Sequence, residues 1–210
     1  MNVRRSLERV FPNLSRRQRA AIDWILTLVV AVGIVFALKA WIVNPYRIPS
    51  SSMEPTLHCA RPELGCEAAT SDRILANRFI YHFRDPKRRE IVVFDPPPRA
   101  KLVCPGGGGV YVKRIIGLPG DRWEERNGYV YIDGRRLREP YVQALRRDHR
   151  TVELNQLLPG TTRIPKDDYI MMGDNRRQSC DSRDWGFVPR RNIIGEVFLT
   201  YWPPSRIATH

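Results

Sequence analysis

The chain has 210 residues, enough for one folded domain plus a membrane anchor, and a formal net charge of +13. Its arginine pairs are short and scattered, and the sequence lacks helix-turn-helix, zinc-finger and aromatic ribonucleoprotein patterns, so nucleic acid is not an expected partner. Attraction to an anionic membrane lipid surface is the simpler explanation of the charge, and a basic surface that serves only solubility is the alternative.

A basic segment and a long apolar run open the chain. Residues 1–20 carry six arginines against one acidic residue, Glu8, and residues 24–43 are apolar apart from Thr27 and Lys39. Twenty helical residues measure about 30 Å, which matches a bilayer's hydrocarbon core, so a transmembrane helix is expected over residues 21–43. A cleavable secretory signal is the alternative, but its apolar core is usually only about 7–15 residues long.

The same charge pattern predicts how the chain is oriented in the cell membrane. An excess of arginine favours the cytoplasmic side for residues 1–20. Residues 44–210 are also basic, but long domains are translocated largely regardless of charge. We therefore expect a single-pass protein whose domain at residues 44–210 is extracytoplasmic.

Short strands between turn residues dominate the part of the chain after the anchor. Asn127-Gly128 and Asp133-Gly134 are strong hairpin turns, and short helices are expected near 141–148 and 153–158. Residues 58–71 and 95–109 read as inserted loops, the second of them rich in proline and glycine. The pattern predicts a mostly β, mainly antiparallel domain. Its expected strands are 73–78, 90–94, 110–116, 129–132, 168–172 and 193–202.

Four cysteines lie in this domain, on the side of the membrane where disulfides persist. They are Cys59, Cys66, Cys104 and Cys180. A local bridge between Cys59 and Cys66 fits their short spacing, but Cys104 could compete for either, and the sequence cannot choose among the three full pairings. The spacings match no zinc site.

Three consecutive serines, Ser50, Ser51 and Ser52, pose the question of a nucleophile. A serine hydroxyl is weak until a base takes its proton, and no histidine motif supplies one. A lysine can serve if its environment lowers its pKa by about three units, which requires roughly 4 kcal/mol. Burial among apolar groups can provide that bias.

Lys113 is the lysine in the most suitable setting. It lies in the sequence V-Y-V-K-R-I-I-G, where strand alternation puts it on one face with Tyr111 and Ile115. The other lysines lie at the membrane edge, in a charged run, in the proline-glycine loop or in a polar turn. A lysine that extends from a strand edge into solvent is the structural alternative.

A third segment, G-D-N-R-R-Q-S-C-D-S-R at 173–183, is dense in small polar side chains. Together with S-S-S-M-E-P-T-L at 50–57 and Y-V-K-R-I-I-G-L-P-G-D at 111–121, it resembles the type I signal peptidases, membrane-bound Ser/Lys endopeptidases of the S26 leader-peptidase family. A weaker box, S-D-R-I-L-A-N-R at 71–78, also fits. The resemblance covers the whole outer domain, and it implies that family's coiled, mainly antiparallel β-domain.

The resemblance implies roles for individual residues. Ser52 matches the nucleophile and Lys113 the general base, in an acyl transfer that requires no cofactor, metal or nucleotide. Ser50 matches the serine that helps the backbone N–H of Ser52 hold the oxyanion, and Ser179 the serine that orients the lysine. Asp181 is expected to pair with Arg183 and Arg114 to brace the site.

Substrates implied by the resemblance are exported preproteins with signal peptides, cleaved after small residues at positions −1 and −3. The residues expected to line the substrate pockets are Ile48, Pro49, Met53, Tyr111 and Val112. An extended substrate pairing beside strand 110–116 would fit β-addition.

The sequence departs from the family pattern at three places. Ser71 stands where glycine is usual, and Arg177-Gln178 replaces Asp-Asn. Cys180 is unusual between Ser179 and Asp181, and a free thiol there would make the enzyme sensitive to oxidation. These departures put local hydrogen bonding and the rate in question, but they remove no proposed catalytic group.

Three other functions compete with this hypothesis. A self-cleaving Ser/Lys protease of the repressor type shares the dyad, but the N-terminal span and the Met-x-Pro-Thr context argue against it. A specialised processing peptidase for conjugation or pilus proteins is closer. A membrane-tethered binding module with a dead site is the non-enzymatic alternative.

Overall fold

The computed structural model describes residues 15–41, 43–104 and 109–210, within two compact units, Met1–Ile42 and Val43–His210. In the first unit, α2 (Arg16–Trp41) is one continuous helix, and its residues Arg16–Phe36 are long and apolar enough to cross a membrane. It begins before the predicted residue 21, and Val43 belongs to the first strand. Its large apolar side chains between residues 24 and 36 are exposed, as expected for a candidate membrane span.

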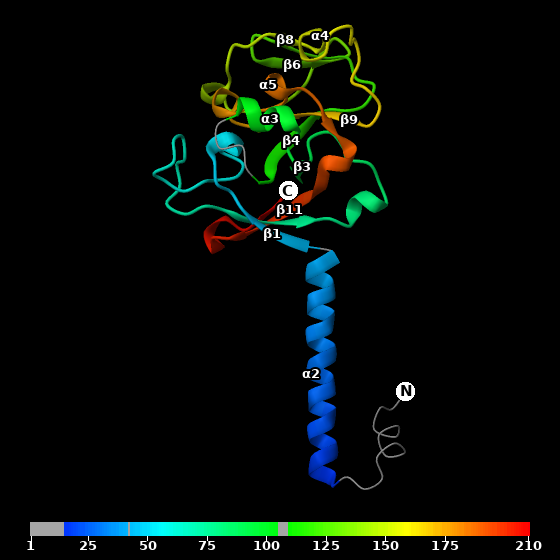
Figure 1. Cartoon of the computed structure of the whole chain (residues 1–210). Helices are drawn as coiled ribbons and strands as arrows, with labels where there is room; N and C mark the ends of the chain where they lie inside the picture. The colour runs from blue at the N-terminus through cyan, green and yellow to red at the C-terminus, as the bar shows by residue number, and fades with distance from the viewer. Residues whose placement is uncertain (1–14, 42, 105–108) are drawn as a thin grey trace. The chain divides into compact units, whose positions relative to one another are not determined.

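The second unit consists of two antiparallel sheets (Figure 1). The larger sheet has the strand order β1-β2-β11-β3-β4-β9-β10, with β12 paired to β11, and the smaller has the order β7-β6-β5-β8. The larger comprises β1 (Val43–Arg47), β2 (Arg73–Asn77), β3 (Ile91–Phe94), β4 (Tyr111–Gly117), β9 (Asp168–Met172), β10 (Val188–Pro189), β11 (Ile193–Trp202) and β12 (Ala208–Thr209); the smaller comprises β5 (Trp123–Arg126), β6 (Tyr129–Ile132), β7 (Arg135–Arg136) and β8 (Val152–Glu153).

Short helices complete this unit. The α-helices are α3 (Pro98–Val103), α4 (Leu154–Leu157) and α5 (Ser182–Trp185), and the 3₁₀ helices are η1 (Ser51–Met53), η2 (Ile80–His82), η3 (Ala144–Arg146), η4 (Arg176–Gln178), η5 (Arg190–Asn192) and η6 (Pro204–Arg206). In Figure 1, β6, β8 and α4 lie at one end of the unit, and β1 lies at the other.

The predicted mostly β, mainly antiparallel fold is confirmed, and each of the six predicted strands is present within one residue at either end. The predicted short helices correspond to η3 and α4. The expected loop at 95–109 is wrong in part, because α3 begins at Pro98, where proline is well tolerated in a first helical turn. Residues 105–108 of the expected loop lie outside the described part of the chain.

Strand β4 lies near the centre of the larger sheet and has unequal edges. Tyr111 to Arg114 pair with β3, whereas pairing with β9 begins only at Arg114. Within the described residues, the β9-side edge of Tyr111, Val112 and Lys113 therefore has no strand beside it. Apolar clusters on the two faces of the sheet hold β4 in place, one around Phe94 and Ile115 and another around Ile48 and Val93.

Candidate active site

The serine segment follows the edge strand β1 and forms the short helix η1. The Ser50 and Ser52 hydroxyl oxygens lie 3.3 Å apart, and Ser52 is 7% exposed. Asn175 holds this segment from the side, because its backbone N–H donates to the Ser52 carbonyl at 3.1 Å and its side-chain amide donates to the Ser51 carbonyl at 3.1 Å. The position of Ser52 therefore depends on the 173–178 loop, which is distant in sequence.

Lys113 is buried in β4, with 5% of its surface exposed. Burial lowers the pKa of Lys113 to about 8, because the charged ammonium loses its hydration. The carboxylate of Asp181 opposes this pKa shift, and the guanidinium of Arg183 adds to it. A neutral amine is thus accessible near neutral pH, as a general base requires.

Ser50, Ser52 and Lys113 line one cleft, which has a volume of about 420 Å³. Its mostly apolar wall comes from two segments, the end of β1 with the residues after it, and the start of β4, which pairs with β3 but not with β9. The structure brings all five of the expected pocket residues together there: Ile48, Pro49, Met53, Tyr111 and Val112. Gln178 and the two cysteines Cys104 and Cys180 line it as well.

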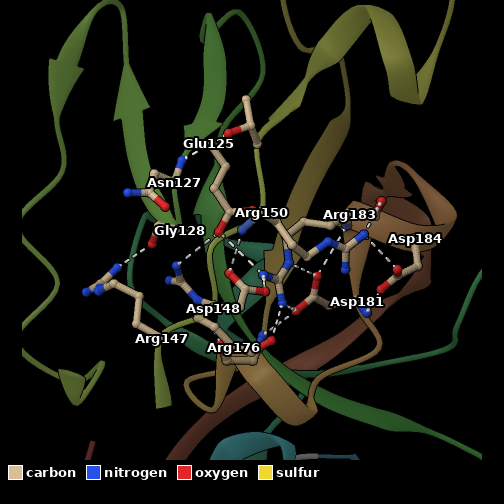
Figure 2. Close-up of polar contacts among 12 residues, drawn as sticks. Glu125, Asn127, Gly128, Arg147, Asp148, Arg150, Arg176, Asp181, Arg183 and Asp184 are labelled. Carbon is tan, nitrogen blue, oxygen red and sulfur yellow. Dashed lines mark hydrogen bonds and ion pairs between the residues drawn. The ribbon is translucent and has the colours of Figure 1, made fainter. Parts of the chain in front are cut away.

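Behind the cleft, Asp181 and Arg183 form a buried ion pair (Figure 2). Two oxygens of Asp181 accept from Nε and Nη2 of Arg183 at 2.8 and 2.9 Å. Burial opposes ionisation of Asp181, but Arg183, together with Lys113 and Ser179, outweighs burial and lowers the pKa of Asp181 to about 2. Asp181 also caps α5 and accepts from the backbone N–H of Gly173 at 3.1 Å, so it joins α5 to the loop that holds Ser52.

The expected pairing of Asp181 with Arg114 is wrong. Arg114 instead forms a two-point ion pair with Asp174, at 2.9 and 2.6 Å. The reason is strand alternation, since neighbouring residues of β4 point to opposite faces and Arg114 therefore points away from the face of Lys113. Asp174 also accepts from the Thr56 hydroxyl at 2.5 Å, and this carboxylate thereby links β4 to the segment after Ser52.

Ser179 is buried and directly follows the 173–178 loop. Within the described part of the chain, its hydroxyl makes no hydrogen bond of normal geometry, but it is near enough to Asp181 to help lower the pKa of that carboxyl. Ser179 is packed against Gly173, where any side chain would overlap both the Ser179 hydroxyl and the Ser52 carbonyl. The described lining of the cleft does not include Ser179, Arg114, Asp181 or Arg183.

The structure pairs the four cysteines as Cys59–Cys66 and Cys104–Cys180. The local bridge is thus present, and Cys104 competes for neither of its partners. The expectation of an oxidation-sensitive free thiol at Cys180 is wrong, because its sulfur is already bonded to Cys104 after the end of α3.

Sequence reasoning missed three residues that hold the site. Asp174 and Asn175 were visible only as part of a polar segment, and no pattern indicated their long-range partners. Glu54 is fully buried after Met53, where its carboxylate bonds His58 Nδ1 at 2.5 Å and the Cys59 N–H at 3.2 Å. It therefore fixes the start of the 58–71 loop beneath the serine segment. Among the described residues, no group of three histidine, cysteine or acidic side chains could hold a metal ion.

Comparison with known proteins shows the family of the chain. The family profile described as "Signal peptidase, peptidase S26" matches residues 21–202. The chain is 38% identical to the probable signal peptidase I-2 of Synechocystis sp., over 86% of this chain and 73% of that protein. It is 34% identical to a signal peptidase I of Leptolyngbya laminosa, over 88% and 81% respectively, and 33% identical to signal peptidase I P of Bacillus subtilis subsp. natto, over 94% and 98%. The chain therefore belongs to the signal peptidase family, peptidase S26, whose members are serine endopeptidases.

Proposed function

We propose that this protein is a type I signal peptidase that removes signal peptides from exported preproteins, with Ser52 as nucleophile and Lys113 as general base. The observation that carries the proposal is the shared cleft, which is lined both by a serine in a short helix and by a buried lysine whose pKa is lowered to about 8. The lysine has no purely structural reason to be there, since a buried amine costs stability unless it is neutral.

In the proposed reaction, neutral Lys113 accepts the proton of the Ser52 hydroxyl while the oxygen attacks the scissile carbonyl. The resulting ammonium gives that proton to the leaving amine as the peptide bond breaks. Water, deprotonated by Lys113, then attacks the ester on Ser52. The Lys113 ammonium returns the proton to the Ser52 oxygen as the ester bond breaks and the signal peptide is released with a free carboxylate.

The oxyanion of each tetrahedral intermediate needs hydrogen-bond donors. The Ser50 hydroxyl, 3.3 Å from the Ser52 hydroxyl oxygen, is one candidate, and the backbone N–H of Ser52 is the other. Removal of one such donor typically lowers the rate by about 10²–10³-fold. Ser179, buried and without a partner in the described residues, is the group proposed to orient Lys113.

The unpaired edge of β4 supports substrate binding by β-addition. Tyr111, Val112 and Lys113 carry backbone groups on the side where no strand pairs with them in the described residues, and they face the cleft. An extended signal peptide placed there would present alternate side chains to the wall formed by Ile48 and Met53. A shallow apolar wall of this kind suits the small residues expected at positions −1 and −3.

The cellular arrangement is proposed from the anchor and the charge. Residues 1–20 would lie in the cytoplasm, residues 21–43 would cross the membrane, and residues 44–210 would lie outside. Two disulfides in the outer domain support an oxidising compartment. The basic surface would then lie beside anionic lipid.

The test is cleavage of a preprotein with the sequence Ala-x-Ala before its mature part, by the full chain in detergent. We expect one product whose N-terminus lies directly after the second alanine, and no product with Ser52→Ala. Cleavage of conjugation or pilus precursors only would favour the specialised peptidase. A wild type inactive on all of these precursors would favour the binding module.

A further inference from the structure

A second cleft lies on the other side of the serine segment. It has a volume of about 550 Å³ and lies between the loop closed by the Cys59–Cys66 bridge and the helices η3 and η4. Gln178 lines both this cleft and the one that holds Ser52 and Lys113.

Direct contacts join the walls of the second cleft to the serine segment. Asn175 donates to the carbonyls of Ser51 and Ser52, and its side chain also donates to Gln178 Oε1 at 3.0 Å. On the opposite wall, Gly65 lies so close to Ser51 and Gln178 that a Cβ atom would overlap the Gln178 side chain. The second cleft therefore begins within one residue of the proposed nucleophile.

The substrate of an endopeptidase extends to both sides of the nucleophile, with residues before the scissile bond on one side and residues after it on the other. In the first cleft, the apolar wall and the free edge of β4 suit the residues before the scissile bond. An extended chain advances about 3.3 Å per residue, and the two clefts share the lining residue Gln178, so the first residues after the bond would enter the second cleft. Gln178 stands at the boundary between the two clefts.

The charges in the second cleft are not balanced. Arg146 forms an ion pair with Glu67 across it. Arg177 is exposed, and its Nη1 donates to the backbone carbonyl of Leu145 at 3.4 Å; in the described residues it has no carboxylate partner. One guanidinium thus remains free to meet an anionic group.

We propose that the second cleft binds the first residues of the mature chain, and that Arg177 makes it prefer acidic side chains there. This inference rests on the proposed function. An exposed ion pair of this kind predicts a preference of about two- to five-fold in kcat/KM.

The test uses two preproteins, identical up to the residue after the scissile bond, with either glutamate or lysine at the next two positions. Wild type should cleave the glutamate substrate faster, Arg177→Glu should reverse the preference, and Glu67→Gln should strengthen it by releasing Arg146. Arg135→Glu is the matched control, because Arg135 is exposed and lies outside the lining of this cleft.

An equal ratio in wild type and Arg177→Glu would overturn the inference, as would an equal shift in Arg135→Glu, which would indicate an effect of net charge alone. If Ser52→Ala is inactive while wild type cleaves both substrates equally, the proposed function stands and only this inference fails. Cleavage of neither substrate by the wild type would reject both.

Discussion

Gly173 lies against the carbonyl of Ser52, and the space there accommodates only glycine. A Cβ atom at position 173 would overlap that carbonyl and the Ser179 hydroxyl at once. The absence of a side chain at position 173 therefore lets the backbone of Ser52 and the hydroxyl of Ser179 both pack against this residue.

We expect Gly173→Ala to lower kcat about 10²-fold, since displacement of a reacting group by about 1 Å has effects of that size. Gly120→Ala is the control. Its φ of +84° makes alanine unfavourable, but open space surrounds it, so this variant should lose stability and keep its kcat. Equal kcat values for Gly173→Ala and wild type would show that the contact does not position Ser52.

The pH dependence of cleavage should report Lys113. Since the neutral amine is the active form, kcat/KM should rise with pH to a midpoint near the pKa of about 8 and then level off. The carboxylate of Asp181 raises the pKa of Lys113, so Asp181→Asn should move this midpoint to lower pH. Asp184 acts in the same direction more weakly, and Asp184→Asn should give a smaller shift. A midpoint that stays fixed or rises in Asp181→Asn would contradict the assignment of the base.

We expect the buried carboxyl of Glu125 to make the free energy of unfolding depend on pH. It is fully buried, its Oε1 lies 3.4 Å from Arg183 Nη1, and its Oε2 has no hydrogen-bond partner among the described residues (Figure 2). Burial raises the pKa of Glu125 from its ordinary 4.5 to about 7, despite the nearby arginines. The folded state therefore binds this proton more tightly than the unfolded state, and the associated stability is lost as the pH rises from about 4.5 through 7.

Glu125→Gln should escape that loss. The difference in Tm, variant minus wild type, should become more positive between pH 5 and pH 8 by the equivalent of about 1–3 kcal/mol. Glu63 is exposed, and Glu63→Gln should show no such trend. A difference for Glu125→Gln that is constant over this range, or that falls, would mean that Glu125 is ionised throughout.

The two disulfides should differ in their contribution to stability. Cys104–Cys180 closes a loop with a sequence separation of 76, against 7 for Cys59–Cys66. Loop-closure entropy predicts that Cys104→Ser/Cys180→Ser lowers the free energy of unfolding by about 2–4 kcal/mol and by more than Cys59→Ser/Cys66→Ser does. Thiol labelling of the unfolded, unreduced wild type should find no reactive cysteine, and labelling at Cys180 would refute this pairing.

The sequence predicted strands where the local pattern and the tertiary pairing agree. Strands such as β6 and β9 are rich in β-branched and aromatic residues between turns, and they were found. β1, with Pro45, and β5, with two consecutive glutamates, form because neighbouring strands pair with them, and this is not visible locally. Short strands such as β7 were missed for the same reason.

The candidate site divides in the same way. Ser52 and Lys113 belong to contiguous motifs, so they could be named from the sequence. The Arg114–Asp174 ion pair and the Cys104–Cys180 bridge join residues 60 and 76 positions apart, and their partners depend on the register of β4 and β9 and on α3. The sequence could not predict that Arg177 lacks a carboxylate partner in the described residues, because this depends on the pairing of Glu67 with Arg146 across the cleft.

The most direct test of the central claim, that neutral Lys113 activates Ser52, is the rate of Ala-x-Ala preprotein cleavage by Lys113→Met. Methionine keeps an unbranched stem in the buried site and removes the amine. Lys101 is exposed in α3, and Lys101→Met serves as the control. We predict that Lys113→Met folds, as judged by circular dichroism and Tm, and is inactive, while Lys101→Met cleaves at the wild-type rate. Cleavage by folded Lys113→Met at the wild-type rate would contradict the account.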